Sequence, residues 1–204
     1  MANRSYDKEA VEFLAQAENI EYVFEIVDRF EDVKNFLLQK FWNTLAHKLE
    51  EQIRGSYGWE VELHDPLKQN GGLWVWPPTG RDAVYLYPII EQAWRISYGI
   101  HWDDDARVDV PKQAEVVERI PAVAQLRQWL TQNGFRHQDQ WWLGLQRAEI
   151  QPMERSSIII IARDDRLEDG LAAAFMQLFV NTHELLTQAN QDIARAAQQG
   201  QLQL

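Results

Sequence analysis

Residues 33–63 read VKNFLLQKFWNTLAHKLEEQIRGSYGWEVEL, and the spacing of apolar residues changes within this stretch. From Val33 to Leu49 an apolar residue recurs at every fourth position, a spacing typical of one face of an α-helix. The last seven residues alternate between apolar and polar, which is typical of a half-buried β-strand. The change near Gly55, a residue suited to ending a helix, predicts helices followed by a sheet.

Apolar residues before Asp28 also fall in helical steps, and the spacing resets after it. Two consecutive helices, or one long bent helix, are therefore expected over residues 1–55. The second apolar stripe is broad, because Phe36 and Trp42 lie beside it, and this predicts a helix buried along more than a narrow seam. We expect Phe41 and Trp42 in the main core.

Residues 56–102 are expected to form an antiparallel meander, because short alternating or apolar runs are separated by turn signals such as Gln69-Asn70-Gly71-Gly72. The expected strands cover residues 57–63, 73–76, 84–90 and 93–102.

Residues 103–165 have a mixed pattern, and residues 166–199 keep helical steps that predict a long C-terminal helix. Within the mixed part we expect a helix from Pro121 to Asn133-Gly134 and either a strand or an extended aromatic segment at 140–146. Ile158–Ile161 is expected to be a buried strand, with the start of a helix as the alternative for so short an apolar run.

The predicted fold is one α+β domain over residues 1–204. N-terminal helices and a long C-terminal helix pack on an antiparallel sheet of about four to six strands.

The charge balance narrows the kinds of molecule that this chain is expected to bind. Twenty Lys and Arg stand against 31 Asp and Glu, which gives a formal net charge of −11. Binding of duplex nucleic acid is not expected, because a polyanion is bound by basic residues that displace its counterions. The absence of cysteine excludes disulfides, thiolate zinc sites and a cysteine nucleophile.

No apolar run approaches the roughly 18 residues of a bilayer span, and the first residues lack the apolar core of a secretory signal. We therefore expect a cytoplasmic protein that does not bind membranes.

Two acidic clusters supply the candidate partner-binding residues. They are Asp103, Asp104 and Asp105, and Asp164, Asp165, Glu168 and Asp169. Three consecutive carboxylates repel one another, and a loop that leaves a strand has little structural need for all three. The second cluster precedes a helix, where negative charge also favours the positive end of the helix dipole. Contact with a basic protein and simple solvation remain alternative interpretations.

Catalytic chemistry has weaker support in the sequence. His101 and the following aspartates could offer nitrogen and oxygen ligands to a divalent ion, but no second histidine has ligand spacing. Neither a phosphate-binding glycine loop nor a nucleophile elbow is present. We therefore predict no catalytic residues, no metal site and no cofactor, and a third hypothesis is a metal-dependent hydrolase around His101.

Short aromatic motifs between Val33 and Trp102 suggest a family. Phe41-Trp42-Asn43-Thr44-Leu45 on a helix, a strand containing Trp59, and Ile96-Ser97-Tyr98-Gly99-Ile100 resemble the C-terminal half of some bacterial and phage proteins of the PD-(D/E)XK nuclease superfamily. That superfamily needs an Asp and then Glu/Asp-x-Lys on adjoining strands. Glu60-Val61-Glu62 and Glu62-Leu63-His64 do not end in lysine. The resemblance implies an accessory half without the nuclease.

The leading hypothesis is a non-catalytic, acidic protein-binding module that engages a basic nucleic-acid-handling protein, as an inhibitor, immunity or anti-defence protein would. The alternative is an accessory domain of a nuclease or defence system. Homo-oligomer formation is compatible with both.

Overall fold

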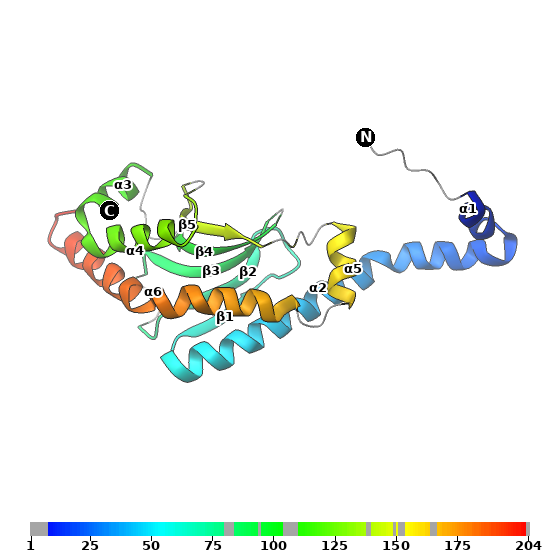
Figure 1. The fold of residues 1–204 in the computed structure, drawn as a ribbon, viewed down its shortest axis with the longest axis horizontal. Coiled ribbons are helices and arrows are strands. Elements are labelled where there is room, and N and C mark those ends of the chain that lie inside the picture. The colour runs from blue at the N-terminus through cyan, green and yellow to red at the C-terminus, as the bar shows by residue number, and fades with distance from the viewer. Residues whose placement is uncertain are drawn as a thin grey trace. The chain divides into compact units, whose positions relative to one another are not determined.

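The computed structural model describes residues 8–79, 84–93, 95–103, 110–137, 140–148, 150, 154–163 and 167–202 (Figure 1). By its internal contacts the chain divides into two compact units, Met1–Leu37 and Leu38–Leu204. Whether residues 1–204 behave as one domain stays a prediction.

The N-terminal part contains a short helix α1 (Lys8–Leu14) and a continuous helix α2 (Ala17–Tyr57) of 41 residues. At 1.5 Å per residue, α2 is roughly 60 Å long. It ends at Tyr57, and the next residue, Gly58, has φ +71° and donates its N–H to the Arg54 carbonyl at 3.1 Å. The predicted stop at Gly55 is therefore too early, because the left-handed conformation occurs three residues later.

The five described strands form one antiparallel sheet in the order β1-β2-β3-β4-β5, so every strand pairs with its neighbour in the sequence. They are β1 (Glu60–His64), β2 (Gly71–Trp76), β3 (Leu86–Gln92), β4 (Ile96–Trp102) and β5 (Trp142–Arg147). The predicted meander is confirmed, and β5 extends it at the segment expected to be extended.

Four more helices complete the described chain: α3 (Val110–Arg119), α4 (Pro121–Gln132), α5 (Arg155–Arg163) and α6 (Leu167–Gln198). The helix starting at Pro121 and the C-terminal helix are confirmed, whereas α3 was not expected. The strand predicted at Ile158–Ile161 is wrong, since these residues lie within α5. Ile158 is buried while Ile160 is 48% exposed, as on a helix with one apolar side.

The main core lies between one face of the sheet and the helices of the second unit. Helix α6 contacts β3 and β4, and α4 contacts α6 and β5. Figure 1 shows α6 running along the sheet. The protein is therefore an α+β protein whose C-terminal helix packs on an antiparallel sheet.

Phe41 and Trp42 belong to this core, as expected, with 1% and 0% of their surface exposed. The Trp42 indole N–H donates to Gln92 Oε1 at 2.8 Å. Burial of the helical stripe begins at Leu38. The expectation that Phe36 is buried is wrong, because it is 68% exposed.

Candidate functional site

The first predicted acidic cluster follows β4. Asp103 is half-buried, and its backbone N–H donates to the Tyr85 carbonyl at 2.9 Å. Asp104 and Asp105 lie outside the described residues. Whether the cluster binds a partner therefore stays a prediction.

His101, the proposed metal ligand, points to the sheet face opposite the main core and is 7% exposed. Its ring lies against Tyr87 and packs edge-on to Trp142, with centroids 5.6 Å and 5.1 Å away. Among the described residues, no three His, Asp or Glu side chains lie close enough together to hold a metal ion. In the part of the chain that the structure describes, His101 is therefore surrounded by aromatic rings and not by a set of metal ligands.

The second predicted acidic cluster is only partly described, because Asp164 and Asp165 lie outside the described residues. Glu168 is 6% exposed, so most of its side chain is turned away from solvent. Asp169 forms an ion pair with Lys48 of α2. These two carboxylates take part in the fold, and their role in partner binding stays a prediction.

The N-terminal unit carries an unusual density of exposed large apolar side chains. They are Val11, Phe13, Leu14, Tyr22, Phe24, Ile26, Val27, Phe30, Val33 and Phe36, each between 46% and 68% exposed. At about 100° per residue, those of α2 other than Phe36 cover an arc of roughly 200° of the helix surface. In the described part of the chain, no helix is long and apolar enough to cross a membrane.

The remaining side of this helix segment is acidic. Glu18, Glu21, Glu25 and Asp28 follow one another in steps of three and four, so they lie in a row along α2. All four are exposed, and no ion pair joins them to any described residue. We call these four carboxylates the acidic stripe.

The sheet face opposite the main core carries a second apolar cluster. Its buried members are Trp76, Val84, Tyr87, Ile89, Trp142 and Leu145. A hollow of about 440 Å³ lies on it, lined by Trp74, Tyr87, Trp141, Trp142 and other residues. Trp141 is 48% exposed at its rim.

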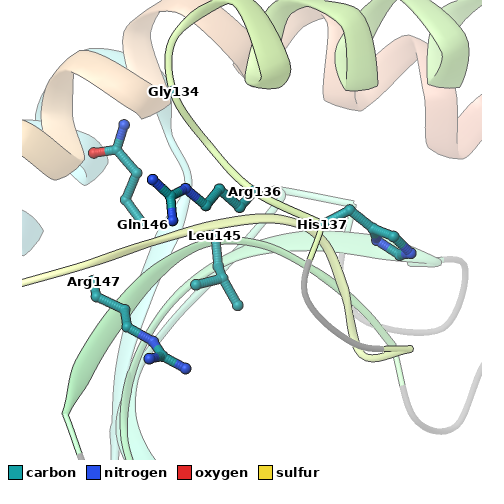
Figure 2. Close-up of a pocket in the computed structure, with 6 residues that line it drawn as sticks. All are labelled: Gly134, Arg136, His137, Leu145, Gln146 and Arg147. Carbon is teal, nitrogen blue, oxygen red and sulfur yellow. The ribbon is translucent and has the colours of Figure 1, made fainter.

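A second hollow, of about 520 Å³, lies at the β5 edge (Figure 2). Its described lining is Gly134, Arg136, His137, Leu145, Gln146 and Arg147. Two arginines thus border one hollow in a chain whose net charge is −11. The sequence does not reveal this pair, because only the strand pairing brings residues 136 and 147 together.

Comparisons with models of protein families, with curated proteins and with solved structures gave no match to this chain. The resemblance to accessory parts of PD-(D/E)XK proteins therefore stays a hypothesis.

Proposed function

We propose that this protein is an acidic protein-binding module, and that α1 and the first half of α2 dock a basic, amphipathic segment of a partner protein. The observation that carries this proposal is the combination, within residues 8–37, of ten exposed large apolar side chains and the acidic stripe.

Burial of the exposed apolar side chains of α2 would supply the free energy for binding a partner. Each large apolar side chain that a partner covers contributes about 1.5–3 kcal/mol when fully buried. Contiguous exposed apolar surface of this kind marks interaction sites on soluble proteins. An amphipathic helix from a partner would place its apolar face on this arc, a common mode of peptide recognition.

The acidic stripe indicates the charge of the partner. Residues 17–37 contain six carboxylates against Arg29 and Lys34, and these two cations already form ion pairs with Asp32 and Glu31. Two copies of this helix would bring two strongly acidic segments close together, and this repulsion opposes self-association. A partner with lysine and arginine beside its apolar face would neutralise the stripe and associate faster.

Nucleic-acid-handling proteins fit this description best, because a groove that holds phosphates also attracts aligned carboxylates. If this protein occupied the phosphate-binding groove of its partner, it would inhibit that partner.

The test uses a synthetic amphipathic helix of leucine and lysine, labelled for fluorescence anisotropy, and the same peptide with glutamate in place of lysine. We expect the full-length protein to bind the lysine peptide and not the glutamate peptide. Glu21→Gln with Glu25→Gln should weaken binding and flatten its salt dependence. Glu118→Gln with Glu184→Gln removes the same charge from exposed sites elsewhere and should change neither.

Ile26→Ser with Phe30→Ser should abolish binding without lowering the melting temperature, because both side chains are exposed. Equal binding of both peptides, or a stable dimer by light scattering that these serines dissociate, would contradict the proposal.

A further inference from the structure

The two arginines at the β5 edge lie on one face of the sheet because of strand pairing. Arg136 bridges to Leu145 through two backbone hydrogen bonds, of 2.8 Å and 3.0 Å, so their side chains share a face. Arg147 lies two residues after Leu145 and therefore shares it too. Diagonal neighbours in such a pairing are about 7–8 Å apart, within reach of long side chains. In Figure 2 the Arg136 side chain extends toward Gln146, Arg147 extends on the side of the strand where Leu145 lies, and the His137 ring points away from both arginines.

The charge of this pair is not neutralised within the described chain. Neither Arg136 nor Arg147 forms an ion pair or a side-chain hydrogen bond with any described residue. Seven other described cations each lie within 4.0 Å of a carboxylate: Arg29, Lys34, Lys48, Arg54, Lys68, Arg119 and Arg195. Two neighbouring arginines that have no carboxylate partner among the described residues create a local positive potential that attracts an anion.

Small residues keep space open beside the arginines. The strand partners of Arg147 and Leu145 on β4 are Ser97, which has a small side chain, and Gly99, which has none, so β4 adds little bulk to this face. Gly134, with φ +82°, also lines the hollow, and a side chain there would approach the Gln146 amide to 3.3 Å. The hollow of about 520 Å³ is large enough for a phosphate group and part of the molecule that carries it.

The framework behind the arginines is held by hydrogen bonds. The Tyr98 hydroxyl donates to Gln146 Oε1 at 2.6 Å, and Gln146 Nε2 donates to the Asn133 carbonyl at 2.8 Å. Gln146 thereby ties the end of β5 to the turn that leads to Arg136. Fixed backbones on both sides reduce the entropy cost of placing two guanidinium groups around one anion.

We propose that Arg136 and Arg147 bind the phosphate group of a phosphorylated ligand. This site goes beyond the proposed docking of a basic protein and lies on different elements. Guanidinium groups match phosphate oxygens in paired hydrogen bonds, which favours arginine over lysine at such sites.

The experiment is calorimetric titration of the full chain, at low ionic strength, with inorganic phosphate, adenosine monophosphate and a single-stranded oligonucleotide. Binding of the free monophosphate and not of the oligonucleotide identifies a phosphate monoester as the ligand group. Stronger binding of the oligonucleotide identifies the phosphates of a nucleic-acid chain.

The variants test the arginines directly. Arg136→Gln and Arg147→Gln should each weaken binding roughly tenfold or more, since each removes charge-assisted hydrogen bonds. Arg136→Lys should retain part of the affinity, because it keeps the charge but loses the paired geometry.

The matched control is Arg155→Gln with Arg163→Gln, two exposed arginines of α5 that form no ion pair within the described residues. It should leave binding unchanged. The proposal is overturned if none of the three probes binds at millimolar concentration, or if the α5 control lowers affinity as much as the β5-edge variants do.

Discussion

Replacing Asn190 with alanine should lower the free energy of unfolding by about 3 kcal/mol or more. Asn190 lies on α6 and is 7% exposed. Its Oδ1 accepts the N–H groups of Tyr85 and Leu86 at 2.7 Å and 2.9 Å, and its Nδ2 donates to the Leu86 carbonyl at 2.8 Å. The Asn190 side chain thus makes the hydrogen bonds that a neighbouring strand would make to the backbone at the start of β3.

The magnitude follows from these three bonds. A typical hydrogen bond contributes about 1 kcal/mol net, and a buried backbone group left without a partner costs about 1–3 kcal/mol. Alanine removes all three bonds, and any water that enters the vacated space can recover only part of the loss.

The assay is urea unfolding followed by tryptophan fluorescence, with Asn181→Ala as the control. Asn181 lies on the same helix but is exposed, and among the described residues its Nδ2 donates only to the Gln177 carbonyl of its own helix. We expect the control to change stability by about 0.5 kcal/mol or less. If Asn190→Ala were no more destabilising than the control, the proposed anchoring of α6 to β3 would be refuted.

Three further results are expected. Trp42→Ala should cost about 3–5 kcal/mol by the same urea assay, because a fully buried indole is lost; an unchanged unfolding midpoint would place Trp42 outside the core. Burial raises the pKa of Tyr98 above 10.0 and so favours its neutral form in the folded protein; stability should fall as pH rises through that pKa, and less so in Tyr98→Phe, as thermal melts across alkaline pH can check. Gel shifts at physiological salt should show no sub-micromolar binding to duplex DNA, and salt-sensitive binding at that level would contradict the charge argument.

Much of the fold is predictable because its signals are local. The change of apolar spacing near Gly55 locates the boundary between helix and sheet, and Pro121 identifies the first turn of α4. Ile158–Ile161 fails as a prediction because a short apolar run fits a buried strand and one side of a helix equally well. The predicted burial of Phe36 is wrong because a helical pattern does not show whether another part of the chain covers that side of the helix.

The candidate sites depend on different information. The acidic stripe is visible in the sequence as carboxylates in steps of three and four from Glu18 to Asp28, a spacing that marks one helix side. The pair of Arg136 and Arg147 is not visible, because it requires the pairing of Arg136 with Leu145. The burial of Glu168 cannot be predicted from the sequence either, since helix capping explains an acidic residue at this position but does not show which residues surround it.

Hydrogen exchange of the full chain, with and without the lysine–leucine peptide, tests the central claim most directly. The exposed surface of residues 17–37 predicts fast amide exchange there in the free protein and slower exchange once the peptide covers it. Residues 41–53 of α2, whose apolar side chains are already buried, should not change. Slower exchange confined to α6 or the sheet, with residues 17–37 unchanged, would contradict the account.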